Sequence, residues 1–320
     1  MIDDEPVLEV ERLSVAYLTG RGAVPAVDEV SLTIAPGEIV GLAGESGCGK
    51  STLIRSILRV LPAPGAIMGG EVRIAGQDVL AMSERELQRL RWREVSWVSQ
   101  SAMSSLNPVM TIGAQIIDVI EAHEGRNAKA QSRAGELLDL VGVGARRLTA
   151  YPHELSGGQR QRVGIALALA LSPRLIIMDE PTTALDVVVQ RAILQRVVAL
   201  QHERGFSVLF ITHDLSLMLQ LCARVGILYA GRLVEMGPAQ QIARAPQHPY
   251  TRGLLGSRLA HDSSGEAPRP IPGTPPDLLH LPPGCAFAPR CDRAIDDCRR
   301  SVPRLPQHAA EHRVACPVVS

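Results

Sequence analysis

The chain has 320 residues, of which 46% are hydrophobic and 21% charged, so it can bury a sizeable core in one large domain or two smaller ones. Lysine plus arginine and aspartate plus glutamate number 33 each, and a formal charge of zero gives no long-range attraction to nucleic acid or anionic lipid. Only 3% of the residues are aromatic, which argues against a platform that stacks nucleic-acid bases.

The sequence predicts neither a membrane span nor an export signal. The most apolar run, Val163 to Leu171, is about half as long as a spanning helix needs. The first residues, Met1 to Glu5, are acidic and lack the basic and apolar regions of a signal peptide. We therefore expect a cytosolic chain that other subunits hold at a membrane if it works there, and in a reducing cytosol its six cysteines are poor disulfide candidates.

The order of predicted elements indicates an α/β protein. Apolar runs predict strands first, and a helical insertion follows, opened by Ser83 and Glu86 as a capping box. Strands then alternate with helices, which predicts a mainly parallel sheet with ligands at the carboxyl ends of its strands. The expected strands are 7–16, 27–34, 38–43, 175–178 and 206–212, and the expected helices are 83–93, 111–123, 128–141, 156–171 and 187–204.

Residues 44–51 read Gly-Glu-Ser-Gly-Cys-Gly-Lys-Ser, which fits a phosphate-binding P-loop. The loop lies between an apolar strand and a predicted helix, where bare backbone amides and the helix N-terminus favour an anion. Lys50 suits the β- and γ-phosphates of ATP, and the Ser51 hydroxyl suits Mg²⁺. The predicted nucleotide contacts are Gly44, Ser46, Gly47, Gly49, Lys50, Ser51 and Thr52.

A second acidic element follows the apolar strand Leu175 to Met178. Asp179 and Glu180 stand where that strand ends, so they are expected at the carboxyl edge of the sheet beside the P-loop. Asp179 suits Mg²⁺, held through water, and Glu180 suits polarisation of the attacking water. These two motifs alone indicate only a P-loop nucleotide hydrolase.

Residues 155–162 read Leu-Ser-Gly-Gly-Gln-Arg-Gln-Arg and resemble the signature of ABC ATPases. A hydroxyl and bare amides at a helix N-terminus can bind a γ-phosphate. In that family the phosphate belongs to the nucleotide of the opposite subunit, which implies this role for Ser156 and Gly158. The resemblance spans about residues 7–240 and implies a P-loop ABC ATPase domain with an antiparallel β subdomain and a helical insertion.

Four further positions are similar to family motifs and take their roles from that resemblance. Tyr17 is similar to the aromatic residue that stacks on adenine, and Gln100 to the glutamine that touches Mg²⁺ and senses the membrane subunit. Ala184-Leu185-Asp186 resembles the loop that crosses the dimer interface, and His213 the histidine that contacts the γ-phosphate. The resemblance thus implies Glu180, His213 and Gln100 as catalytic residues, and Ser51, Gln100 and Asp179 as Mg²⁺ ligands.

We find no internal repeat, so we expect one nucleotide-binding domain, residues 1–245, with its helical subdomain at about 101–160. In this family such a domain completes its site only by head-to-tail pairing, so the resemblance implies a second ABC ATPase subunit, a homologue or a copy. A soluble ABC protein acting on ribosomes or DNA is an alternative. The single ATPase domain and the lack of a heptad run disfavour it, and no nucleic-acid partner is expected.

Residues 246–320 form a proline-rich C-terminal extension that contains 13 of the 23 prolines. Three segments, 248–255, 284–291 and 312–316, resemble the region after the ATPase domain in dipeptide and oligopeptide importers. The resemblance implies a peripheral protein on the cytoplasmic face of the plasma (inner) membrane, with two transmembrane permease subunits and an extracytoplasmic substrate-binding protein as partners. Importers of nickel and other small solutes share this family, and an exporter motor is a further alternative that the extension disfavours.

Four of the six cysteines lie in this extension, separated by 5, 6 and 17 residues, at Cys285, Cys291, Cys298 and Cys316. An extension this poor in apolar residues needs a cross-link, and a metal is a better candidate than disulfides in the cytosol. Zinc prefers closer cysteine pairs. The spacing suits an iron–sulfur cluster better, and the resemblance also implies a [4Fe-4S] cluster, with Zn²⁺ as the alternative. Cys48 and Cys222 are not expected to be ligands.

Overall fold

The computed structural model describes residues 5–100, 105–182, 185–259, 271–306 and 311–319. The chain divides into two compact units. The first unit comprises the N-terminal residues up to Val7 together with Ala35–Gly37 and Ala81–Leu209, and the second comprises Leu8–Ile34, Glu38–Leu80 and the chain from Phe210 onward. The domain boundary expected at residue 245 and the helical subdomain expected at about 101–160 stay predictions.

A four-stranded antiparallel sheet opens the second unit. It is built from β1 (Leu8–Thr19), β2 (Gly22–Ile34), β4 (Gly65–Ile74) and β5 (Gln77–Asp78), in the order β2-β1-β4-β5. Leu8 pairs with Ile34 on one side and with Ile74 on the other, and all three side chains are fully buried. One face of this sheet therefore forms a hydrophobic core, as the predicted β subdomain requires.

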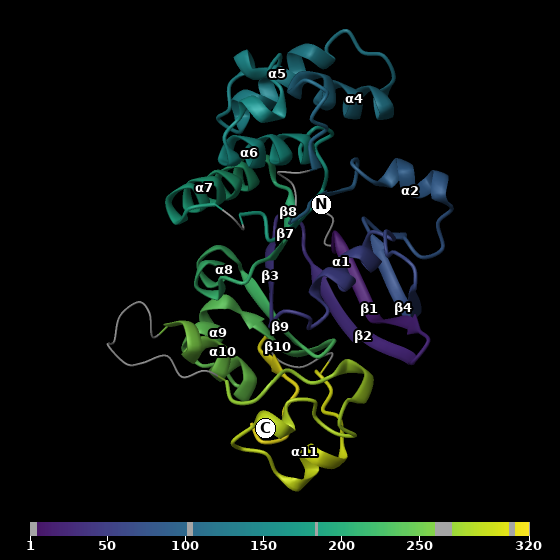
Figure 1. Ribbon diagram of the computed structural model, residues 1–320, viewed down its shortest axis with the longest axis vertical. Coiled ribbons are helices and arrows are strands. Elements are labelled where there is room, and N and C mark those ends of the chain that lie inside the picture. The colour runs from purple at the N-terminus through teal and green to yellow at the C-terminus, as the bar shows by residue number, and fades with distance from the viewer. Residues whose placement is uncertain (1–4, 101–104, 183–184, 260–270, 307–310, 320) are drawn as a thin grey trace. The chain divides into compact units, whose positions relative to one another are not determined.

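The second unit also contains strands in the order β11-β10-β9-β3. The pairing of β3 (Ile39–Ala43) with β9 (Arg224–Tyr229) is parallel, whereas β10 (Arg232–Pro238) and β11 (Arg313–Val314) continue the sheet antiparallel. Figure 1 shows the C-terminal strand beside β10, so the C-terminal extension adds a strand to this sheet. The helices of this unit are α1 (Lys50–Ile57), α8 (Leu215–Leu221), α9 (Ala239–Arg244), α10 (Pro249–Leu259) and α11 (Asp296–Arg300).

The first unit combines strands in the order β8-β7-β6 with a group of helices. β6 (Val95–Val98) and β7 (Leu175–Asp179) pair in parallel, and the chain passes into the second unit within β8 (Ser207–Ile211). Figure 1 shows α4, α5 and α6 gathered together. The helices of this unit are α2 (Glu84–Leu90), α4 (Ile112–Glu124), α5 (Ala130–Leu140), α6 (Gly157–Ala168) and α7 (Val187–Arg204).

Capping residues at the predicted positions explain where several of these helices begin and end. The capping box of Ser83 with Glu86 opens α2, and Asp186 and Gly205 bound α7 at the predicted residues. Three helices are shorter than predicted, among them α5, which spans Ala130–Leu140 rather than 128–141. α2 ends at Leu90 because Arg91 is extended, and α6 ends at Ala168 rather than Leu171. No helix in the described part of the chain is apolar over the length that a bilayer crossing demands.

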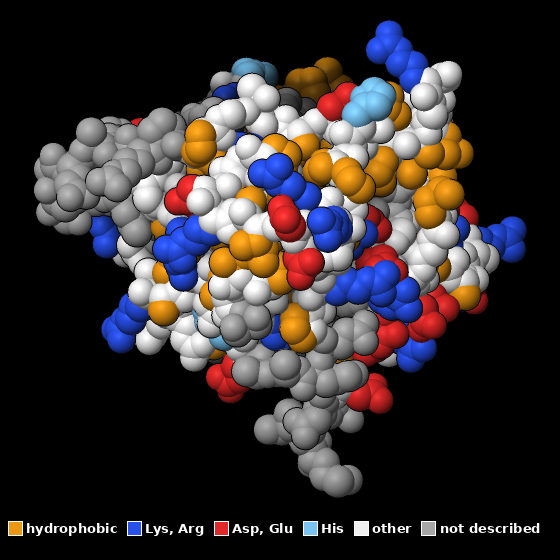
Figure 2. Space-filling view, turned by 90° about the horizontal axis from the view of Figure 1, so that it is seen from below, with side chains coloured by type: hydrophobic (Ala, Val, Ile, Leu, Met, Phe, Trp, Pro, Cys, Tyr) orange, Lys and Arg blue, Asp and Glu red, His pale blue; other side chains and the backbone are white. Residues whose placement is uncertain are grey.

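The C-terminal extension is held by short elements: η3 (Leu278–His280), η4 (Ala288–Arg290), α11 and β11. Figure 2 shows that basic and acidic side chains are intermixed on the face seen there, so that this face does not carry charges of one sign alone. This mixture agrees with the zero formal charge of the sequence.

Candidate nucleotide-binding site

The loop between β3 and α1 has a backbone that only glycine permits at two positions. Gly49, the residue before α1, has a φ of 108°, and a Cβ there would overlap the carbonyl oxygen of Ala26. A Cβ at Gly44 would overlap the carbonyl oxygen of Leu228. Because a glycine precedes the helix, no capping side chain covers its first N–H groups, which can therefore face an anion.

The ammonium group of Lys50 lies within this loop. The residue is only 9% exposed, and its Nζ donates hydrogen bonds to the carbonyl oxygens of Gly44 (2.8 Å) and Glu45 (3.0 Å). The thiol of Cys48 is 3.5 Å from the same Nζ. The positive charge of Lys50 is thus held inside the loop by backbone carbonyl oxygens, at the place from which a P-loop lysine binds the phosphates of a nucleotide.

Tyr17 and the first turn of α1 lie together. The half-buried ring of Tyr17 projects from β1, and its Oη is 3.3 Å from Oγ1 of Thr52. The aromatic residue predicted for adenine is therefore held beside the P-loop helix. Ser46 and Gly47 are exposed, and Ser51 is half-buried.

His213 follows β8 in the second unit and is exposed. Its neighbours hold the backbone on both sides: Asp214 donates its N–H to Oγ1 of buried Thr212 at 3.1 Å and caps α8 by accepting from the N–H of Leu217 at 3.1 Å. The imidazole therefore stands on a well-braced turn at the carboxyl end of a strand, where ligands of α/β sheets bind.

In the first unit, two of the predicted catalytic residues meet. The amide Nε2 of Gln100 donates a hydrogen bond to Oε2 of Glu180 at 2.9 Å. Glu180 directly follows buried Asp179, and its φ of 46° is left-handed, a conformation that costs a non-glycine residue about 1–2 kcal/mol. Such strain gathers at functional sites, where surrounding contacts hold it.

The predicted signature lies against the start of α7, also within the first unit. Ser156 caps α6 by accepting from the N–H of Gln159 (3.3 Å), and a Cβ on buried Gly158 would come within 2.8 Å of Cγ1 of Val189. Asp186 caps α7 by accepting from the N–H of Val189 at 2.9 Å. Asp186 and the signature are thus linked through one valine, whereas Ala184 lies outside the described residues.

Two exposed valines follow Asp186. Val187 and Val188 are 78% and 79% exposed, although both are β-branched apolar residues on the first turn of a helix. The pair stands next to a residue that the family resemblance assigns to a subunit interface, and exposed apolar neighbours at such a place favour a protein contact.

The four cysteines of the extension are only partly assembled. The N–H of Cys285 donates to the carbonyl oxygen of Cys298 at 2.7 Å. Burial raises the pKa of the Cys285 thiol, and the nearby thiols of Cys298 and Cys316 raise that pKa further. Burial also raises the pKa of Cys291 and of Cys316. Within the described ranges, however, no three His, Cys, Asp or Glu side chains are grouped so that they could hold a metal ion, so the structure does not support the predicted cluster or zinc.

Comparisons with known proteins place these motifs in a family. The sequence profile of ABC transporters matches residues 27–183, and the profile of the C-terminal region of oligopeptide/dipeptide transporters matches residues 234–298. A putative peptide import ATP-binding protein of Brucella abortus is 43% identical over 327 residues, which cover 98% of this chain and 97% of that protein. The chain belongs to the family of ABC transporter ATP-binding proteins, in its oligopeptide and dipeptide branch.

Other relatives of this ABC transporter ATP-binding protein are also named as ATP-binding proteins of dipeptide or oligopeptide transport. The dipeptide transport ATP-binding protein DppD of Caldanaerobacter subterraneus is 41% identical, with 97% of this chain and 96% of that protein covered. The oligopeptide transport ATP-binding protein OppD of Mycobacterium tuberculosis is 46% identical over 97% of the chain, which spans about half (52%) of that longer protein. A solved dimer of the ATP-binding cassette MJ0796 with ADP and Pi has a TM-score of 0.65 at 30% identity, covering 72% of this chain and 98% of that one.

Family membership confirms the predicted ABC ATPase fold. The individual site residues stay predictions. The P-loop, Tyr17 and His213 are in the second unit, whereas Gln100, Asp179, Glu180 and the signature are in the first.

Two residues of the C-terminal extension reach the P-loop of this ABC protein, and sequence reasoning assigned neither a role. Arg290 donates from Nη1 and Nη2 to the carboxylate of Glu45 at 2.8 and 3.1 Å. The hydroxyl oxygen of Tyr250 accepts the N–H of Glu45 at 2.8 Å. Both residues stand in segments quoted for the importer resemblance, but only the tertiary contacts reveal the partner.

A buried carboxylate fastens the extension to β10. Glu235 is fully buried and accepts hydrogen bonds from the N–H groups of Gln247 (2.7 Å) and His248 (2.9 Å). His312 places its Nε2 2.7 Å from the same carboxylate. With its acceptor sites satisfied, this charge can be buried at the joint between the sheet and the extension.

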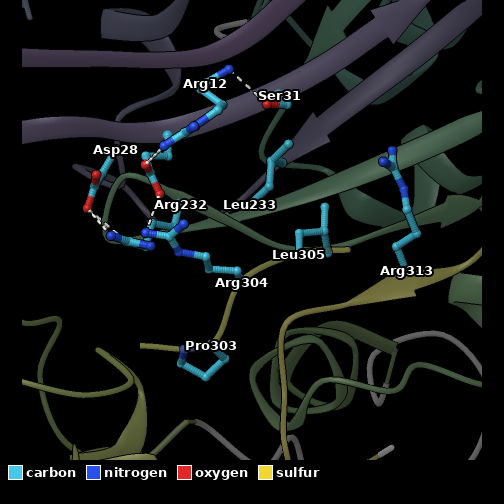
Figure 3. Close-up of a pocket in the computed structure, with 10 residues that line it drawn as sticks. Arg12, Asp28, Ser31, Arg232, Leu233, Pro303, Arg304, Leu305 and Arg313 are labelled. Atoms are coloured by element: carbon cyan, nitrogen blue, oxygen red, sulfur yellow. Dashed lines mark hydrogen bonds and ion pairs between the residues drawn. The ribbon is translucent and has the colours of Figure 1, made fainter. Parts of the chain in front are cut away.

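An arginine-lined pocket of about 290 Å³ lies in the second unit between β1, β2, β10 and the extension (Figure 3). Arg12 and Arg304 both pair with Glu29, at 2.6 and 3.2 Å, and Arg232 pairs with Asp28 at 2.8 Å. Of these three pairs, the one between Arg304 and Glu29 joins the extension to β2, whereas the other two link β1 and β10 to β2.

Proposed function

We propose that the chain binds and hydrolyses ATP as one of two ABC ATPase subunits that drive the import of di- or oligopeptides. The observation that carries the proposal is the P-loop with Lys50 fixed at its centre, in a chain whose C-terminal region has the oligopeptide/dipeptide type. Relatives that match along nearly their whole length are named for peptide import and dipeptide transport.

The residues take distinct roles in this proposal. Tyr17 stacks on adenine, the P-loop amides and Lys50 bind the phosphates, and Ser51, Asp179 and Gln100 hold Mg²⁺. Mg²⁺ would neutralise charge on the phosphate oxygens. Glu180 polarises the attacking water, with its carboxylate oriented by the amide of Gln100, and His213 contacts the γ-phosphate. The remaining nucleotide contacts are Gly44, Ser46, Gly47, Gly49 and Thr52.

The proposed site is completed by pairing. Ser156 and Gly158 would serve the nucleotide of a second ATPase subunit, and Asp186 would lie at the interface. The exposed Val187 and Val188 beside Asp186 support a protein contact there. The dimeric cassette MJ0796 provides a related precedent. The partner subunit is proposed to be a homologue.

The wider assembly follows from the same proposal. Two transmembrane permease subunits would hold this chain on the cytoplasmic face of the membrane, and an extracytoplasmic binding protein would deliver the peptide. Because ATP closes such a pair and hydrolysis releases it, the motor has the two states that a transporter needs.

For the extension we propose a [4Fe-4S] cluster on Cys285, Cys291, Cys298 and Cys316, with Zn²⁺ as the alternative. The support is the chemistry of the donor set: four thiols in an extension with little core, where burial first and then neighbouring thiols raise the pKa of Cys285, Cys291 and Cys316. Such a group would cross-link the extension.

The function is tested with the assembled transporter in vesicles. Glu180→Gln should retain ATP binding but lose turnover and uptake of a labelled tripeptide, whereas Glu203→Gln, the same change at an exposed site on α7, should keep both. Wild-type hydrolysis by Glu180→Gln would refute the assigned role. Uptake of Ni²⁺ but not of tripeptide would replace the peptide proposal by the small-solute alternative.

The metal proposal is tested by the iron, sulfide and zinc content of chain purified without oxygen, beside a variant with all four extension cysteines changed to serine. About four iron and four sulfide per chain, lost in the variant, are expected for the cluster. One zinc would establish the alternative, and no metal in either sample would remove both.

A further inference from the structure

Glu45, the second residue of the P-loop, is held from three directions. Arg290 binds both oxygens of its carboxylate, the Tyr250 hydroxyl accepts its N–H, and Lys50 donates to its carbonyl oxygen. Two of these three partners belong to the C-terminal extension. The loop that would bind phosphate is therefore braced by a part of the chain that follows the ATPase region.

The contact of Arg290 with Glu45 is an interior contact. The Arg290 side chain is 6% exposed and that of Glu45 is 23% exposed, and the pairing is bidentate. Charge-assisted pairs of this kind are short and directional, and removing one partner leaves the other charge buried. The hydrogen bond with Glu45 also raises the pKa of Arg290.

The remaining polar atoms of the Arg290 side chain also have fixed partners. Its Nε donates to the carbonyl oxygen of Pro272 at 2.8 Å, and its Nη1 is 3.3 Å from the hydroxyl oxygen of Tyr229. Its guanidinium carbon lies 5.9 Å from the ring centroids of Tyr229 and Phe287. The guanidinium therefore has one defined position, set by both the extension and β9.

A cluster of aromatic rings also holds the C-terminal extension against β9. The ring centroid of Tyr229 is 4.5 Å from that of Tyr250 and 5.3 Å from that of Phe287, and the centroids of Tyr250 and Phe287 are 5.4 Å apart. The chain has only four tyrosines and three phenylalanines, and three of these seven gather here. The extension is thus packed against the strand that pairs with β3, directly beside the P-loop.

The charge of Arg290 matters for an anionic ligand. Without it, Glu45 would carry an unpaired carboxylate in the loop that has to receive the phosphates of ATP, and like charges at short range repel strongly when partly buried. The carboxylate would also be free to compete for Lys50. Arg290 neutralises that charge and keeps Glu45 turned toward the extension.

We propose that Arg290 is a positioning residue for nucleotide binding: through Glu45 it fixes the P-loop, so that the integrity of the C-terminal extension sets the affinity for ATP. The inference rests on the proposed ATP hydrolysis at this loop. It also ties the proposed cysteine site to the nucleotide, because Arg290 is the chain neighbour of Cys291 and ends the turn that follows Cys285.

The test measures KM for ATP and kcat in the assembled complex for wild type, Arg290→Ala, Glu45→Gln and the double variant. Arg290→Ala should raise KM about tenfold with a smaller change in kcat, because an unpaired carboxylate opposes phosphate binding before chemistry. In the Glu45→Gln background the charge is gone, so Arg290→Ala should add little. Arg290→Lys, which keeps the charge but loses the second hydrogen bond, should lie between.

Arg300→Ala, an exposed arginine on α11, is the matched control and should leave KM unchanged. An unchanged KM for ATP in Arg290→Ala would overturn the proposal. So would a double variant whose KM increase is the product of the increases in the two single variants. If Arg290→Ala does not fold, Arg290→Lys and Glu45→Gln carry the same comparison.

Hydrogen exchange of the amides in residues 44–51, without nucleotide, separates this proposal from the proposed function. Faster exchange is expected in Arg290→Ala and not in Arg300→Ala, while protection of β1 and β4 shows that the fold is kept. If the wild type fails to hydrolyse ATP, the proposed function fails and the exchange result still decides whether Arg290 fixes the loop. Equal exchange in both variants rejects the positioning role.

Discussion

The side-chain amide of Gln100 donates a 2.9 Å hydrogen bond to the carboxylate of Glu180, across 80 residues of sequence. This contact joins the residue proposed to polarise water to the residue proposed to sense Mg²⁺ and the membrane subunit. It gives the Glu180 carboxylate a defined direction, which a general base needs before water arrives.

Loss of that contact should lower turnover. Gln100→Ala removes the donor, and we expect kcat to fall about tenfold or more with ATP binding retained. Gln100→Glu places a second carboxylate against Glu180, and like-charge repulsion should make it the more severe change. Steady-state hydrolysis and ATP binding measured for both variants test this, with Gln190→Ala on α7 as the control amide. Equal kcat in all three variants contradicts the orienting role.

Gly158 should tolerate no side chain unless Val189 is shortened. A Cβ at Gly158 would meet Cγ1 of Val189 at 2.8 Å, so Gly158→Ala is expected to lower the free energy of unfolding by about 1–3 kcal/mol. Adding Val189→Ala removes the clashing methyl and should recover part of that loss. Gly256→Ala on α10, where a Cβ meets nothing within 4 Å, should be neutral or stabilising. Urea unfolding of the wild type, these three variants and the Val189→Ala single variant tests this. If the losses of the two single variants simply add in the double variant, the clash is refuted.

Acid should weaken the attachment of the extension through His248. Burial lowers the pKa of His248 to about 4, and its Nδ1 accepts the N–H of Tyr250 at 3.1 Å, which requires a neutral ring. The unfolded chain, with a pKa of about 6.5, binds the proton more tightly, so stability is constant above that pH and falls as the pH drops toward 4. We expect a loss of about 2 kcal/mol from this group between pH 7 and pH 5.

The matched variant for that prediction is His248→Asn, because an asparagine oxygen can accept the same N–H and does not titrate in this range. Urea unfolding at pH 7 and pH 5 should show a smaller pH dependence in the variant than in the wild type. The same slope in both proteins would assign the acid sensitivity to other groups.

Cys48 should react slowly with thiol reagents and block the site once modified. Burial raises its pKa, although the neighbouring Lys50 ammonium lowers it, so the thiol is protonated at neutral pH. We expect alkylation to speed up as the pH rises above 9, to be slowed by ATP, and to stop hydrolysis because the added group meets Lys50. Mass spectrometry beside an ATPase assay, with Cys48→Ala as the unreactive control, tests this. Full Cys48 modification with unchanged hydrolysis would sink the prediction.

Much of the site could be predicted because its signals are local. The P-loop lies between β3 and α1 as expected, since a buried apolar run, fixed glycines and a following helix are all encoded within about a dozen residues. The bounds of α7 match because Asp186 caps it and Gly205 ends it. The strands β9 and β10 were not predicted, since their apolar runs carry no motif and acquire meaning only through their neighbours in the sheet.

The sequence by itself determined the family and the starts of α2, α6 and α7, because each depends on residue types within a few positions of one another. The tertiary structure alone decided that Arg290 meets Glu45 across 245 residues, that Glu235 is buried at the joint with the extension, and that Glu180 adopts a left-handed backbone. It also left the four cysteines without a group arranged for a metal in the described chain. Such contacts arise from packing and sheet pairing between distant segments, which no local pattern specifies.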